Sequence, residues 1–131
     1  MSADNESSSI AEELSKLEKV CQRAVADISS SRNVRETLEL ADVDVPQHLR
    51  AIASVKLPAL RRVLRVRDLR VEEIVKDQLE WLSRERSETV ASREFDRMKA
   101  TDWPMLQANY PDLYWKVLRE ANLILERKRK R

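Results

Sequence analysis

The chain has 131 residues, a formal net charge of +2 and no glycine, and 37% of its residues are charged. Without glycine, phosphate-binding loops and dinucleotide fingerprints cannot form in the usual way, and tight hairpins are disfavoured. A hydrophobic content of 42% is enough for one core. We therefore predict an all-α protein: a single compact bundle of six or seven helices over residues 9–126, between a disordered N-terminus (1–8) and a basic C-terminal tail (127–131).

The first predicted helix begins after Ser9, which can form a capping box with Glu12, and ends at the serines of positions 29–31. Its apolar residues alternate at spacings of four and three, which is the pattern of a heptad seam: Ile10, Leu14, Leu17, Cys21, Ala24 and Ile28. The seam has two interpretations. It is one stripe of the chain's own bundle, or it is a coiled-coil surface for a homodimer or a helical partner, centred on Leu14, Leu17 and Cys21.

Two short helices are expected next. Asn33 can cap the first, and Asp44 can cap the second, which carries Pro46 in its first turn. Residues 46–67 can also be drawn as a helix-turn-helix, or with a strand over 51–56 as in ribbon–helix–helix dimers.

The stretch 57–82 is the densest in apolar residues, and we read it as two helices. Pro58 suits the first turn of one, and Asp68 can cap the other. The second of these helices is predicted to lie at the centre of the core, because its apolar residues form one stripe. That stripe consists of Val71, Ile74, Val75, Leu79 and Leu82.

After Leu82 the helix is expected to continue through residues 83–94, with a break near Ser87 or Ser92 as the alternative. Thr101 or Asp102 can cap a short helix that ends at Asn109, which can adopt the left-handed conformation of a C-cap. A last helix is expected from about residue 112. Of the aromatic residues near the C-terminus, Trp115 lies off its helix's apolar stripe and is predicted to be the most exposed, as a partner-binding residue.

Two basic groups point to nucleic acid, because lysine and arginine bind backbone phosphates. They are a central arginine cluster and the C-terminal tail, namely Arg61, Arg62, Arg65, Arg67, Arg70, Arg127, Lys128, Arg129, Lys130 and Arg131. We predict a non-enzymatic accessory or regulatory protein that contacts DNA or RNA through these residues. The alternative is a helical protein–protein adaptor or scaffold subunit of a larger complex, with no nucleic-acid contact.

No catalytic, metal or cofactor site is predicted. The chain has one histidine, His48, and one cysteine, Cys21, and no zinc-ligand spacing. We expect Cys21 to be a buried structural thiol, and we expect no small-molecule substrate. No stretch reaches the ~20 apolar residues that span a bilayer. The N-terminus lacks a signal-peptide pattern. The sequence therefore predicts an intracellular protein, cytoplasmic or nuclear, without membrane contact.

Overall fold

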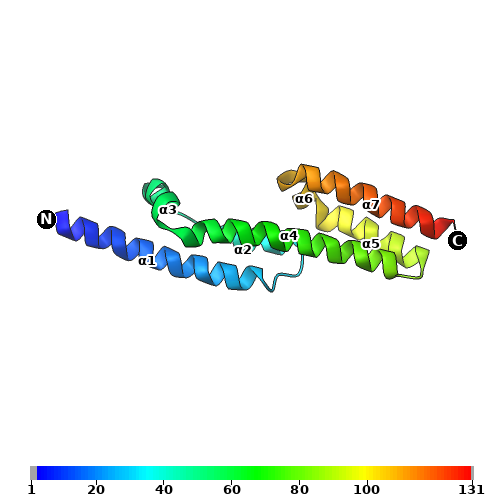
Figure 1. The fold of residues 1–131 in the computed structure, drawn as a ribbon, viewed down its shortest axis with the longest axis horizontal. Helices are drawn as coiled ribbons and strands as arrows, with labels where there is room; N and C mark the ends of the chain where they lie inside the picture. The colour runs from blue at the N-terminus through cyan, green and yellow to red at the C-terminus, as the bar shows by residue number, and fades with distance from the viewer. Residues whose placement is uncertain (1–2, 131) are drawn as a thin grey trace. The chain divides into compact units, whose positions relative to one another are not determined.

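The computed structural model describes the backbone of residues 3–130 and the side chains of residues 9–130. These residues form seven α-helices and one short 3-10 helix, with no strand among them (Figure 1). The elements are α1 (Ala3–Ile28), α2 (Val34–Ala41), η1 (Gln47–Leu49), α3 (Arg50–Lys56), α4 (Pro58–Arg84), α5 (Glu88–Thr101), α6 (Trp103–Asn109) and α7 (Pro111–Arg129). The prediction of an all-α fold with six or seven helices is confirmed.

The chain packs as two compact units. Unit 1 contains Met1–Ser31 and Thr37–Arg70, and unit 2 contains Arg32–Glu36 and Val71–Arg131. Helix α4 contributes its first half to unit 1 and its second half to unit 2. The predicted single domain over 9–126 stays a prediction. The predicted disorder of residues 1–8 also stays a prediction. Met1, Ser2 and the side chains of residues 3–8 lie outside the described part of the chain.

The core of unit 1 forms between α1 and the start of α4. From α1 it takes most of the predicted heptad stripe, and Ala41, Ala53, Leu57 and Val63 complete it; the α1 members are Leu17, Cys21, Ala24 and Ile28. Ile10 lies at the exposed end of the stripe. The stripe is thus used within the chain, as the first of its two interpretations expects.

The core of unit 2 brings α5, α6 and α7 against the second half of α4. Trp103 is fully buried, and its ring meets the edge of Phe95 at a centroid distance of 5.7 Å. The indole Nε1 donates to Gln78 Oε1 at 3.0 Å, so the one polar atom of this ring has a partner. Of the predicted central stripe, Val71, Ile74, Val75 and Leu82 are buried, whereas Leu79 is half-buried.

Asp102 joins the start of α2 to unit 2. It stands before α6, but its side chain does not cap that helix. Instead, its buried carboxylate accepts hydrogen bonds from the backbone N–H of Val34 (3.1 Å) and of Arg35 (2.8 Å), and from Gln78 Nε2 (3.2 Å). The predicted cap by Asn33 is confirmed, since its Oδ1 accepts from Glu36 N at 2.8 Å. Two side chains therefore share the free amides of one helix start.

Several predicted helix boundaries are wrong. Helix α4 continues through Asp68, because nothing between Pro58 and Arg84 breaks it and Asp68 pairs with Arg67 instead of capping. The chain does break after α4, where Ser87 caps α5 by accepting from Val90 N at 3.2 Å. Ser9 lies inside α1 rather than at its cap.

Three further local predictions fail. Asp44 caps no helix, since η1 follows Pro46 without a side-chain cap. The strand drawn over 51–56 is part of α3, which a single residue, Leu57, separates from α4. Asn109 ends α6, but no described residue has a positive φ; the stop comes from Tyr110 in a non-helical conformation and from Pro111 after it.

Candidate nucleic-acid interface

The five central arginines do not line one side of α4. Arg61, Arg62 and Arg65 are exposed, whereas Arg67 and Arg70 are half-buried. Helical spacing explains the division: residues three and four apart share a face, so Arg65 lies over both Arg61 and Arg62. Val63, between them in sequence, points into the core of unit 1. We call the three exposed side chains the outer arginine face.

Arg67 and Arg70 are held by contacts within unit 1. The Arg67 guanidinium lies 3.0 Å from Asp68 Oδ1. Arg70 donates from Nε and Nη2 to the backbone carbonyl of Ser31, at 3.1 and 2.5 Å. That carbonyl follows the end of α1, where carbonyl groups lack helical partners. Contact of either arginine with a phosphate would compete with these bonds.

The outer arginine face makes fewer contacts within the chain than Arg67 and Arg70 do. Arg61 Nη2 donates to the carbonyl of Ser54 at 2.8 Å, which ties it to the last turn of α3. Within the described chain, Arg62 and Arg65 make no hydrogen bond and no ion pair. Lys56, which is also exposed and has no partner among the described residues, ends α3 in the same turn as Ser54. Sequence reasoning missed Lys56, although its position just before the arginines could have indicated it.

The basic tail is the end of helix α7, and most of its described cations are used inside unit 2. Lys128 Nζ donates to the carbonyl of Ser83 (3.0 Å) and to that of Glu85, which covers the C-terminal end of α4. Arg129 pairs with Glu88 at 3.0 Å, and Lys130 pairs with Glu126 at 3.5 Å. Arg127 has no such partner in the described part of the chain, and Arg131 lies outside that part.

The ion pair at this helix end has a consequence for pH. The hydrogen bond from Arg129, with a second from Ser92, holds the pKa of Glu88 below the usual value of a glutamate. A lowered pKa in the folded state means that this contact stabilises the fold above the ordinary pKa and is lost as the pH falls through the lowered one. We expect Arg129→Gln to raise the pKa of Glu88 in an NMR titration of its carboxyl carbon. An unchanged titration would show that the pair does not persist in solution.

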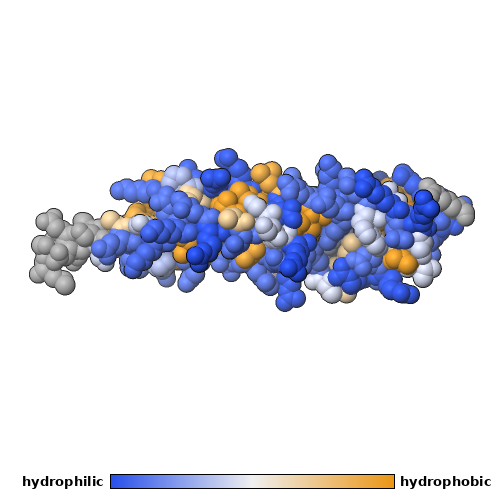
Figure 2. Space-filling view, turned by 90° about the horizontal axis from the view of Figure 1, so that it is seen from below, coloured by the Kyte–Doolittle hydropathy of each residue, from blue (hydrophilic) through white to orange (hydrophobic). Residues whose placement is uncertain are grey.

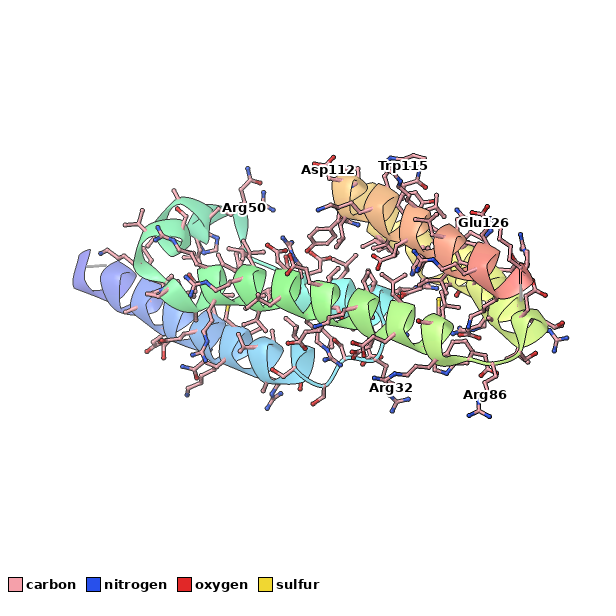
Figure 3. The ribbon with its side chains drawn as sticks, turned by 45° about the vertical axis from the view of Figure 1, so that its right-hand side comes forward. Arg32, Arg50, Arg86, Asp112, Trp115 and Glu126 are labelled. Carbon is pink, nitrogen blue, oxygen red and sulfur yellow. The ribbon has the colours of Figure 1, made fainter. Side chains whose placement is uncertain are left out.

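The predicted partner-binding residues of α1 are largely covered. Leu17 and Cys21 are buried in the core of unit 1, and Leu14 is half-buried against it. Burial, with the nearby Glu18 charge adding to it, raises the pKa of the Cys21 thiol, as expected of a structural cysteine. Trp115 is instead 57% exposed and projects from α7 (Figure 3). Its ring meets that of Tyr114 edge-on at 5.1 Å.

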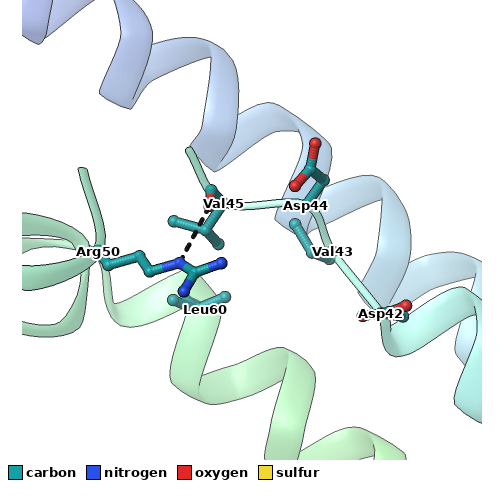
Figure 4. A pocket seen from close by; sticks show the side chains of 6 residues that line it. All are labelled: Asp42, Val43, Asp44, Val45, Arg50 and Leu60. Carbon is teal, nitrogen blue, oxygen red and sulfur yellow. Dashed lines mark hydrogen bonds between the residues drawn. The ribbon is translucent and has the colours of Figure 1, made fainter. Parts of the chain in front are cut away.

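A shallow pocket in unit 1 brings two carboxylates and a guanidinium together. It lies between the segment that follows α2, η1/α3 and α4, and has a volume of about 530 Å³ (Figure 4). Arg50 Nε donates to the Val45 carbonyl at 3.4 Å across it, with Asp42 and Asp44 on its lining. The described residues that line this pocket include no serine, cysteine or histidine. His48 lies elsewhere, with Nε2 2.9 Å from Glu13 Oε2.

Among the residues that the structure describes, no group of three or more His, Cys, Asp and Glu side chains could hold a metal ion. In the same part of the chain, no helix has both the length and the apolar character needed to cross a bilayer. The surface view shows mostly hydrophilic side chains with smaller hydrophobic areas between them (Figure 2).

Comparison of the chain with protein-family models, with curated proteins and with solved structures finds no match.

Proposed function

We propose that this is a non-enzymatic helical accessory protein that contacts the phosphate backbone of DNA or RNA through unit 1. The observation that carries the proposal is the outer arginine face: three exposed guanidinium groups on consecutive turns of α4, of which Arg62 and Arg65 have no partner within the described chain. Guanidinium groups are planar donors that match phosphate oxygens.

Two further features support contact with an anion. Arg61 is oriented by the Ser54 carbonyl through Nη2 alone and is exposed, so its other N–H groups can meet a phosphate with less loss of side-chain freedom. Arg61 is the fourth residue of α4 and lies at the end of its first turn, where the helix dipole adds a positive potential, and Arg62 and Arg65 follow in the next turn. Lys56 extends the basic surface onto α3. No base-reading element is part of the proposal, so binding should show little sequence preference.

The experiment is a salt titration of binding to a nonspecific DNA duplex and to single-stranded RNA, followed by fluorescence anisotropy. For duplex DNA, each phosphate contact contributes about −0.9 to the slope of log K against log salt. We expect the triple variant Arg61→Ala, Arg62→Ala, Arg65→Ala to reduce the slope by up to about 3.

The matched control removes the same charge from exposed arginines of unit 2 that have no partner among the described residues: Arg86, Arg93 and Arg119, each replaced by alanine. We expect the control to retain most of the wild-type slope. Equal losses in both variants would indicate a general charge effect, and no binding at low salt by the wild type would refute the proposal.

A second candidate is the helical protein–protein adaptor, which one observation favours. Trp115 is a large exposed aromatic side chain backed by Tyr114, and tryptophan and tyrosine are enriched among the residues that dominate protein interfaces. Under this hypothesis nucleic acid does not bind at low salt. Trp115→Ala then weakens capture of a partner without altering the melting temperature.

A further inference from the structure

Unit 2 contains a groove that the nucleic-acid proposal does not use. It runs between α4 and α7 and has a volume of about 580 Å³. Val75 and Val117 form its buried floor. Leu79, Leu113 and Ile124 line it as half-buried side chains, which leaves apolar surface of both helices open to solvent.

The two helices beside the groove run in the same direction (Figure 1). Their register is fixed at one end, where Lys128 of α7 binds the carbonyls of Ser83 and Glu85 at the end of α4. Both helices rise about 1.5 Å per residue. Counting back equally along each helix places Lys116 level with Glu72, and Glu120 level with Lys76.

Charged residues stand along both edges of the groove in a fixed order. On α4 the order is Glu72, Lys76 and Glu80, and on α7 it is Lys116, Glu120 and Arg127. The α4 edge therefore reads negative, positive, negative, and the α7 edge reads positive, negative, positive. None of the six makes a hydrogen bond or ion pair with another described residue.

We infer that a second copy of the chain covers this groove, with a two-fold axis along the groove. This symmetry places α4 of one copy opposite α7 of the other, with the helix directions preserved. Glu72 then meets Lys116 of the other copy, Lys76 meets Glu120, and Glu80 meets Arg127 about one turn further on. Each edge charge then has an opposite charge of the other copy at its own level or about one turn away, and the apolar linings of the two grooves form a shared core.

The other two-fold arrangement places its axis across the groove, and with the axis level with Lys76 its charges oppose it. Each α4 would then lie antiparallel to the α4 of the other copy. Lys76 would face Lys76, and Glu72 would face Glu80. On α7, Glu120 would face Glu120. Like charges placed opposite each other disfavour association, so the edges favour the first arrangement over this register. With the axis midway between Glu72 and Lys76, these two residues would pair between copies, and exchanging the charges of residues 72 and 116 would then weaken the dimer instead of restoring it.

The test is sedimentation equilibrium of the full chain without nucleic acid, so that it is independent of the proposed phosphate contacts. We expect the wild type to be a dimer in the micromolar range. Glu72→Lys places two lysines together at both symmetry-related sites, and should raise the dimer dissociation constant at least about tenfold. Lys116→Glu should do the same, and the double variant that exchanges the two charges should restore the dimer.

The control is Asp77→Lys, the same charge reversal at an exposed residue of α4 that lies outside the groove and has no partner within the described chain. It should leave the dissociation constant unchanged. Thermal unfolding followed by circular dichroism checks that each variant is folded, since Glu72 is exposed and its replacement removes no core contact.

Three outcomes would overturn the inference. The first is a wild type that stays monomeric up to high micromolar concentration. The second is a dimer that neither charge reversal weakens, because its contact surface must then lie elsewhere, for example on α1. The third is a tighter dimer with Glu72→Lys, which is the result expected of the antiparallel arrangement, where the introduced lysine would meet Glu80 of the other copy.

Discussion

Replacing Leu82 by alanine is expected to lower the free energy of unfolding of unit 2 by about 2–5 kcal/mol, the usual cost of truncating a buried leucine. Leu82 is fully buried on the second half of α4. Urea denaturation followed by tryptophan fluorescence measures this loss, because Trp81, Trp103 and Trp115 all belong to unit 2.

Leu79→Ala is the matched comparison, since it is the same substitution on the same helix. Leu79 lines the groove and is only half-buried, so its truncation removes less buried surface and should cost less than about 2 kcal/mol. If the groove is covered by a second copy, the cost of Leu79→Ala grows with protein concentration, whereas that of Leu82→Ala does not. Equal costs at low concentration would mean that the burial along α4 is assigned wrongly.

Asp102→Ala is expected to destabilise unit 2 by about 2–4 kcal/mol, although it removes only a small side chain. Its carboxylate is the acceptor for the amides of Val34 and Arg35 and for the Gln78 side chain. Without it, the buried amide of Val34 and the part-buried donors of Arg35 and Gln78 lose this acceptor, and the start of α2 loses a cap. The same urea denaturation measures the effect.

Asp96→Ala is the control for Asp102→Ala. Asp96 lies in α5 and makes one exposed ion pair, with Lys99 at 3.4 Å, so its loss should cost no more than about 0.5 kcal/mol. Asp102→Asn keeps one acceptor oxygen and should fall between the two. An Asp102→Ala variant as stable as Asp96→Ala would show that α2 does not depend on this carboxylate.

The sequence predicts most helices of this chain because their apolar spacing is local and strong. The main errors lie where two local signals compete. At Asp68, a residue that favours caps interrupts an apolar period that in fact continues: Val63, Arg67, Arg70 and Ile74 follow one another on a single side of α4. Had that helix been read as continuous, Arg67 and Arg70 would have been expected on the inner side.

The candidate site was predictable only in part, for the same reason. Arg61, Arg62 and Arg65 could be predicted as site residues from the density of arginine in this stretch and from helical spacing, and they are exposed. The partners of Lys128 and Arg129 could not be predicted, because these partners lie at the end of α4 and in α5, far from the two cations along the chain. The role of Asp102 as acceptor for the amides of Val34 and Arg35 could not be predicted either. These residues lie 68 and 67 positions away, and no local pattern encodes such a contact.

That contact also bears on how the protein is made. While the chain leaves the ribosome, Val34 and Arg35 emerge long before the carboxylate that will accept from their amides. Unit 1 has all its buried residues once Val63 has been translated, but the start of α2 must wait for α5 to be finished. Unit 1 can therefore fold early during synthesis. Unit 2 is completed later, when Asp102 binds the start of α2, which was synthesised many residues earlier.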